Sequence, residues 1–190
     1  MFSSHRCTPL ARRWRLAAVF AGCVATLASA IALSASEGPI SLIEAVKAGD
    51  LAAVKSLLAK QADVAAAEAD GTTALHWAVE NDNDALVAVL LAAGAKAQVV
   101  NRHGIAPIHR AATNGNASIV NRLLAAGAEA NFATPAGETP LMMAARTGNA
   151  AAVQALIAKG AEVNTREAWR GQTALMWAAA RTTSRRSASS

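Results

Sequence analysis

Histidines and carboxylates are the residues of this 190-residue chain that could carry acid–base or metal chemistry. His76 and His109 lie 33 residues apart in similar phrases, so they recur by repetition and not as a pair of metal ligands. Glu80, Asp82 and Asp84 fall around an expected helix–helix turn, where carboxylates are normally solvated. We therefore predict no catalytic residue, no metal site and no cofactor.

Catalytic sequence motifs are also missing. The sequence contains no G-x-S-x-G, no Walker-type glycine loop, no H-E-x-x-H and no cluster of His and Cys with metal-ligand spacing. Both cysteines, Cys7 and Cys23, lie in the N-terminal segment, so we expect no disulfide and no thiolate metal site further along the chain. These absences give no support to a small-molecule substrate.

Glycine spacing shows what the chain does contain. Four glycines separated by 33, 33 and 34 residues each open a similar phrase (TTALHWAV, IAPIHRAA, ETPLMMAA and QTALMWAA): Gly71, Gly104, Gly137 and Gly171. A second phrase of the type LLAAGAE recurs every 33 residues, from Leu57, Leu90, Leu123 and Leu156. Two phrases with one period predict a repeat array, an architecture that presents long surfaces.

Each unit is predicted to form two short helices and a long turn. Thr73 can cap a first helix, and an apolar residue of each first helix should point inward: Leu75, Ile108, Leu141 and Leu175. Glycines such as Gly115 should end the first helices and glycines such as Gly127 the second helices, because glycine readily adopts a left-handed conformation. We expect a repeat domain over 37–181, with units at 38–67, 68–100, 101–133 and 134–166, a partial unit at 167–181 and a disordered tail at 182–190.

The motifs resemble the ankyrin repeat, whose pattern runs T-P-L-H-x-A-A, then G-N or G-D, then V-x-x-L-L-x-x-G-A-x-x-N. The resemblance covers about three quarters of the chain and rests on phrases such as Thr139-Pro140-Leu141 and Gly148-Asn149. It implies an all-α repeat solenoid of helix-turn-helix units with β-hairpin-like turns, about four full repeats plus a truncated fifth. Ala106 replaces the usual Thr, which predicts a weaker cap. Met142 and Met176 replace His, which removes the local Thr–His hydrogen bond, and one extra residue predicts a bulge at 166–170.

The resemblance also implies where a partner protein would bind, because partners of this family usually lie against the turn tips and the exposed side of the first helices. Carried onto this sequence, that surface consists of Asp70, Thr72, Glu80, Asn81, Arg102, His103, Ile105, Thr113, Asn114, Pro135, Glu138, Arg146, Thr147, Trp169, Arg170 and Gln172. Trp169 is flanked by arginine, a composition typical of binding hot spots. The alternative is that Trp169 folds back on the neighbouring turn. Trp77, Trp177 and the methionines Met142, Met143 and Met176 are predicted to pack between or near the helices.

Charge distribution argues against nucleic acid as the partner. The chain carries a formal net charge of +5. Residues 37–180, however, contain eleven Lys or Arg and thirteen Asp or Glu, which gives this part a net charge of −2. A protein that follows a phosphate backbone needs a basic face. The repeats do not supply one, so the expected partner is a protein.

Residues 1–36 are predicted to be an export signal. Arg12, Arg13 and Arg15 form a positive region, an uncharged apolar run spans 16–33, and Ala28-Ser29-Ala30 suits signal peptidase. The apolar run is long, so an uncleaved membrane anchor over 16–35 is the main alternative, followed by lipidation at Cys23, and the arginine pair weakly resembles a twin-arginine signal. A buried first helix is disfavoured because the segment lacks the repeat period and a polar face. The predicted location is periplasmic or secreted, with membrane contact only through this segment.

The C-terminal unit lacks the sequence of a second helix, because Trp177 is soon followed by RTTSRRSASS. Leu175, Met176 and Trp177 could then stay partly uncovered. Three explanations are an incomplete gene product, a frameshift and a partner that covers this face. Three functions follow: a non-enzymatic protein-binding module, the scaffold or targeting part of a longer exported enzyme, and a membrane-anchored spacer.

Overall fold

The structure is a computed structural model that describes the backbone of residues 41–187 and the side chains of residues 41–181. The predicted signal or anchor over 1–36 lies outside the described residues. The described part is a compact unit of its own. Within it the regular elements are all α-helices: α2 (Leu42–Lys47), α3 (Leu51–Ala59), α4 (Ala74–Glu80), α5 (Asp84–Ala92), α6 (Pro107–Asn114), α7 (Ala117–Ala125), α8 (Pro140–Thr147), α9 (Ala150–Ala158) and α10 (Ala174–Ser187).

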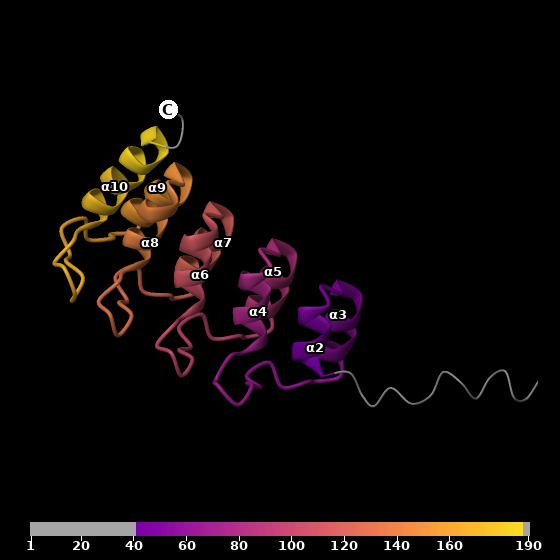
Figure 1. Ribbon diagram of the computed structural model, residues 1–190. Coiled ribbons are helices and arrows are strands. Elements are labelled where there is room, and N and C mark those ends of the chain that lie inside the picture. Colours follow the sequence, from indigo (N-terminus) through magenta and orange to yellow (C-terminus); the bar gives the residue numbers. More distant parts are fainter. Residues whose placement is uncertain (1–40, 188–190) are drawn as a thin grey trace, which may run out of the picture. The chain divides into compact units, whose positions relative to one another are not determined.

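Helix pairs stack side by side, and the long turns project from one edge of the stack (Figure 1). The first helices α2, α4, α6, α8 and α10 contact one another in order, and so do the second helices α3, α5, α7 and α9. Apart from the helices, the described residues contain one isolated bridge between Ala67 and Thr73. The predicted all-α repeat solenoid is therefore confirmed.

Helix starts follow the repeat. Second helices begin after a side-chain cap at one repeat position, Asp50, Asn83, Asn116 or Asn149, whose oxygen accepts backbone N–H groups of the first turn. Thr139 caps α8 in the same way, with Oγ1 accepting from the Met142 N–H at 3.4 Å. Ala106 has no side-chain acceptor, as predicted, so the start of α6 lacks that bond.

Helix ends use left-handed residues. Gly115 and Gly148 end α6 and α8 with φ of 79° and 73°, and Asp82 has a φ of 53° at the same position after α4. The corresponding position of the fifth unit holds Thr182, and α10 continues to Ser187. The helix therefore runs past the boundary at residue 181 where we expected a disordered tail, because no glycine or proline interrupts it.

The core lies between successive pairs. Leu75, Ile108 and Leu141 of the first helices are buried, as are Leu90, Leu123 and Leu156 of the second helices. The expectation that Leu175 points inward is wrong: its side chain is 77% exposed. Met176 is also 48% exposed, which corrects its placement near the core. Both lie on α10, which has no second helix packed beside it among the described residues.

Candidate protein-binding surface

Each turn is closed by a hydrogen bond at one repeat position. The N–H of the residue that opens the turn donates to a carbonyl further along the turn, at 2.9–3.1 Å. In three turns the acceptor lies four residues later: Glu68 to Thr72, Asn101 to Ile105 and Thr134 to Glu138. In the last turn it lies five residues later, from Glu167 to Gln172. The extra residue of the fifth unit therefore lies inside its turn, in the region where the sequence predicted a bulge.

Side chains of the opening residues hold the turns in shape. Asn101 Oδ1 accepts from the N–H groups of His103 and Ile105 at 3.1 and 3.0 Å, and Thr134 Oγ1 accepts from the Glu138 N–H. These local bonds occupy backbone donors that would otherwise need water. The tips are thus ordered before any partner arrives.

The fifth turn depends on a buried carboxylate. Glu167 is 6% exposed, and its oxygens accept from the N–H groups of Trp169, Arg170 and Gln172 at 2.5, 2.7 and 3.1 Å. Burial by itself would raise the pKa of Glu167, but the three backbone donors lower it below its ordinary value, so the group stays ionised. The wider turn leaves Trp169 86% exposed, so this side chain does not fold back on its neighbour.

The first turn is bonded to the second, and the third to the fourth. The Arg102 N–H donates to Asp70 O at 2.7 Å and its guanidinium donates to Ala69 O, while the Ala168 N–H donates to Ala136 O at 3.0 Å. Gly137 permits the last contact, since a Cβ there would lie 2.8 Å from Ala168 N. The tips therefore form two bonded pairs, and Gly104 lies close against the Pro135 ring between the pairs.

Most of the predicted contact residues do lie on this surface. The exposed ones are Glu80, Asn81, Arg102, His103, Asn114, Pro135, Arg146, Trp169 and Arg170, and the half-buried ones are Asp70, Ile105, Thr113, Glu138, Thr147 and Gln172. Two hollows gather several of them between the turns and the first helices. One of about 290 Å³ is lined by Asp70, Glu80 and His103, and one of about 330 Å³ by Glu138, Trp169 and Arg170.

Thr72 is the exception, because its side chain is buried. Its N–H and Oγ1 donate to the two oxygens of Asp70 at 2.9 and 2.8 Å. These bonds lower the pKa of Asp70. Thr72 shapes its turn and offers no free side chain, so its assignment to the contact surface is wrong.

Asparagines at the ends of the first helices join adjacent units. Asn81 Nδ2 donates to the carbonyls of Val46 and Lys47 at 3.4 and 3.3 Å, and Asn114 Nδ2 donates to those of Val79 and Glu80 at 2.9 and 3.4 Å. These bonds reach carbonyls at a helix C-terminus, where the regular helical partners are missing. For Val46 and Val79 they add to the local bonds from the N–H groups of Gly49 and Asp82. The family resemblance marked Asn81 and Asn114 as contact residues, and the structure shows that each also has this structural role.

Sequence reasoning missed a charged group beside the first turn. Lys47 Nζ lies 2.5 Å from Glu68 Oε1 and 4.3 Å from the centroid of the Trp77 ring, and Trp77 Nε1 donates to Glu68 Oε2 at 2.9 Å. The hydrogen bond from Lys47, followed by that from Trp77, lowers the pKa of Glu68. In the sequence, only the repeat positions of these three residues indicate that they lie close together.

The two repeated histidines are structural, as the sequence predicted. His76 and His109 are 4% and 1% exposed. The Nδ1 atoms of His76 and His109 accept from the N–H groups of Thr73 and Ala106 at 3.2 and 3.0 Å, respectively. The proton of each neutral ring is therefore on Nε2. Nε2 of His76 donates to Ile105 O and Nε2 of His109 donates to Phe132 O, each in the following unit. Burial lowers the pKa of both imidazoles, which stay neutral. Among the described residues, no group of three or more His, Cys, Asp and Glu could hold a metal ion.

An apolar groove of about 400 Å³ lies at the C-terminal end of the described units. It is lined mainly by α8, α9 and α10, and three of its side chains are unusually exposed for their type: Ile157 and Val163 at 47%, and Leu175 at 77%. Val153 of α9 also lines the groove and is half-buried, whereas its counterpart in the preceding unit, Val120 of α7, is fully buried because α9 packs beside α7. The groove lies where a further second helix would pack.

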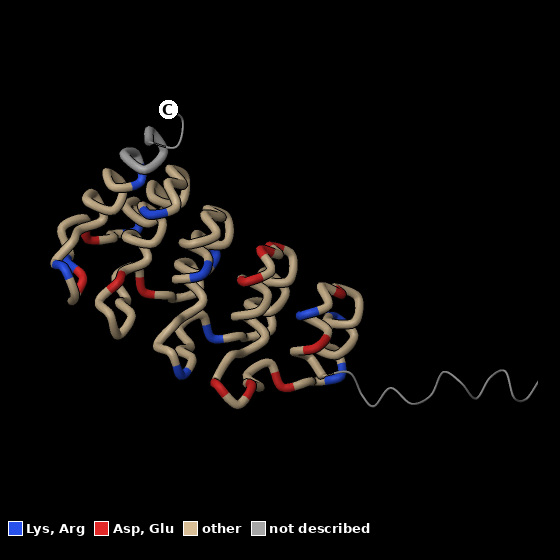
Figure 2. The backbone as a smooth tube through the Cα atoms, viewed as in Figure 1, with Lys and Arg blue, Asp and Glu red and all other residues tan. Residues whose placement is uncertain are grey.

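Charges of both signs are interspersed along the described units (Figure 2), in agreement with the net charge of the repeats. Across residues 41–187, none of the helices combines the length and the hydrophobicity that a membrane span requires.

Comparison with known families gives one match. A family model described as ankyrin repeats, in three copies, matches residues 16–101 and 108–186. No curated protein matches the chain.

Proposed function

This chain belongs to the ankyrin repeat family, whose repeats generally serve protein–protein interaction and are typically non-catalytic, and we propose that it binds one partner protein against its turns and first helices. No catalytic step is assigned to it, and neither nucleic acid nor a small-molecule substrate is its ligand. The partner lies on the surface that runs from Asp70 to Gln172, with Thr72 left out.

The observation that carries this proposal is the row of hydrogen-bonded turn tips. Hydrogen bonds fix the backbone within each turn, between the first two turns and between the last two, while Arg102, His103, Pro135, Trp169 and Arg170 project their side chains. A pre-ordered surface loses little conformational entropy on binding, which favours affinity. Exposed Trp and Arg are the residue types most often found at binding hot spots.

Affinity capture tests the proposal. The chain is immobilised, an extract of the source cells is passed over it, and a variant with Arg102→Ala and Trp169→Ala is run in parallel. A matched control carries Lys55→Ala and Lys159→Ala. Both lysines are exposed, and they lie on or beside the second helices. We expect a protein retained by the parent and the control but lost from the turn variant. Equal retention by all three would remove the turns as the binding surface.

Export is the second part of the proposal. We infer that residues 1–36 direct the chain to the periplasm or the exterior, supported by the arginines, the apolar run and Ala28-Ser29-Ala30. The family match begins at residue 16, inside this segment, so an additional N-terminal repeat helix is the competing interpretation. Sequencing the N-terminus of the protein from its source cells decides: a start near residue 31 supports a cleaved signal, and an intact start supports an anchor or a helix.

A second candidate function has one observation in its favour. The apolar groove beside α9 and α10 would be covered by further helical sequence, as in the scaffold part of a longer exported enzyme. The mass of the protein isolated from its source cells tests this candidate. A polypeptide longer than 190 residues that contains these repeats would favour it.

A further inference from the structure

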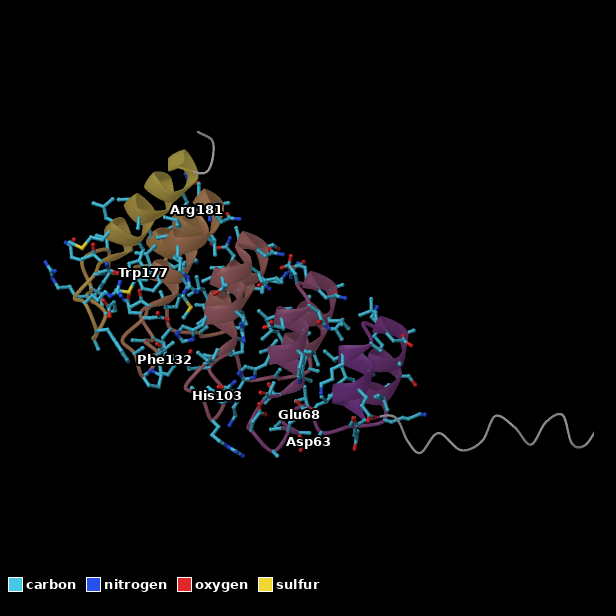
Figure 3. The ribbon with its side chains drawn as sticks, viewed as in Figure 1. Asp63, Glu68, His103, Phe132, Trp177 and Arg181 are labelled. Atoms are coloured by element: carbon cyan, nitrogen blue, oxygen red, sulfur yellow. The ribbon has the colours of Figure 1, made fainter. Side chains whose placement is uncertain are left out.

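Two sets of three side chains occupy the same repeat positions in different units. Each set consists of a cation from the preceding first helix, a glutamate that opens a turn and a tryptophan of the next first helix: Lys47, Glu68 and Trp77, and then Arg146, Glu167 and Trp177. The offsets are 99, 99 and 100 residues, and the last is larger because of the extra residue in the fifth turn. Glu68 and Trp177 lie toward opposite ends of the described units (Figure 3).

The first set is complete. Glu68 accepts from Trp77 Nε1 at 2.9 Å with one oxygen and lies 2.5 Å from Lys47 Nζ with the other, while Lys47 stands over the Trp77 ring. One carboxylate thus satisfies an indole N–H and a cation together. This arrangement shows that a carboxylate satisfies both the indole and the cation at these repeat positions.

The second set lacks its carboxylate. Glu167 uses its oxygens on the backbone of the widened turn, and Trp177 Nε1 is buried without a hydrogen-bond partner. The Arg146 guanidinium lies over the Trp177 ring at 5.3 Å, as Lys47 does over Trp77. Among the described residues Arg146 forms no ion pair. A donor and a cation therefore remain where the first set holds an acceptor.

We propose that the hollow of about 330 Å³ beside Trp177 binds a carboxylate of the partner protein, which takes the place that Glu68 has in the first set. The carboxylate accepts from Trp177 Nε1, which is buried in the free chain and must be uncovered as the ligand enters, and it pairs with Arg146, which lies over the Trp177 ring. The exposed Trp169 and Arg170, which line the hollow, contact the residues around the carboxylate. This inference rests on the proposed function and specifies its partner: an acidic segment that inserts one Asp or Glu side chain, or a chain terminus.

Charge supports a carboxylate as the ligand. A buried indole N–H without an acceptor is unfavourable, and an ionised acceptor forms a stronger hydrogen bond than a neutral one. Glu167 stays ionised, but both of its oxygens are occupied by three backbone donors, whose dipoles offset part of its field on an incoming anion. Glu138 also lines the hollow and is the internal competitor for the indole.

The indole N–H resonances of the ¹⁵N-labelled full-length chain test the proposal. Each of the four tryptophans is assigned by its Phe variant. The probes are three acetylated pentapeptides: Ala-Ala-Glu-Ala-Ala amide, Ala-Ala-Gln-Ala-Ala amide and Ala-Ala-Gln-Ala-Ala with a free C-terminus. We expect the Glu peptide to shift the Trp177 resonance downfield and the Gln amide to bind at least about tenfold more weakly. The free-terminus peptide separates a terminal from a side-chain carboxylate.

Trp77 is the control within the same molecule, since Glu68 already occupies its acceptor position. Arg146→Gln should weaken the Glu peptide about tenfold, whereas Lys47→Gln, at the same repeat position, should not change its binding at the Trp177 site. Equal response of Trp77 and Trp177, or equal binding of all three peptides, would overturn the proposal. A shift of the Trp177 resonance in ligand-free Glu138→Gln would do so as well, because Glu138 would then be its acceptor.

Failure here and failure of the proposed function give different results. A captured partner that depends on Arg102 and Trp169 but not on Arg146 would leave the binding function in place and remove the carboxylate site. Loss of capture in Arg146→Gln, without loss in Lys47→Gln, is the result that both proposals expect.

Discussion

Acidification from pH 7.5 to 5.5 should destabilise the repeat array through His76 and His109. In the folded chain each Nδ1 accepts a backbone N–H, so a proton added there would replace an acceptor by a donor that faces another donor. Burial is the main cause that lowers the pKa of both groups below the ordinary 6.5, and the nearby charge of Asp70 opposes it only for His76. The neutral imidazole is therefore the form that folding selects.

The sign and the size follow from linkage. Below pH 6.5 the unfolded chain binds more protons than the folded chain, so the free energy of unfolding falls as pH falls. The stability that depends on the neutral imidazoles is fully present above pH 6.5, and it is lost as the pH falls toward the pKa of the folded state. If neither imidazole is protonated in the folded state, each costs about 1.4 kcal/mol between pH 7.5 and 5.5, so the two together cost at most about 2.7 kcal/mol.

Urea denaturation followed by circular dichroism at both pH values measures this loss. The double variant His76→Gln and His109→Gln is compared with itself at the two pH values, which separates titration from any packing cost of the substitutions. A lower limit of pH 5.5 keeps most carboxylates ionised in both states. Equal free energies of unfolding for the parent at the two pH values, or the same loss in the double variant, would refute the reasoning.

Three further predictions concern the packing of the repeats, and each is measured by urea denaturation. Leu123→Ala should cost about 2–5 kcal/mol because the side chain is fully buried, whereas Leu175→Ala should cost less than about 0.5 kcal/mol; similar losses would mean that the packing register is wrong. Gly127→Ala should cost about 1–2 kcal/mol for its φ of 92° alone, and Gly137→Ala at least about 1 kcal/mol more because its Cβ meets backbone at 2.8 Å. A smaller loss for Gly137→Ala would show that the turns are not in close contact. Asn114→Ala should cost about 1 kcal/mol, since it removes the bonds to two carbonyls of the preceding unit; no loss would exclude that link.

Much of the candidate surface could be predicted because the turns recur with the helices. The family resemblance, together with the extra residue, placed Trp169 and Arg170 at a projecting tip, and both are exposed. Thr72 was misassigned because a turn position does not reveal which side chains fold inward onto Asp70. Leu175 was misassigned because the pattern marks an apolar face without saying whether another helix covers it.

The sequence by itself determined the repeat, its period, the two helices per unit and the structural role of the histidines. These features are local or periodic, since caps, glycine stops and apolar stripes act within a few residues and recur with the unit. Tertiary structure decided which polar groups meet across units. Glu68 and Glu167 occupy the same repeat position, yet one residue inserted in a turn directs the second carboxylate to the backbone and away from Trp177. Such choices depend on side-chain distances between units, which the period of a sequence does not contain.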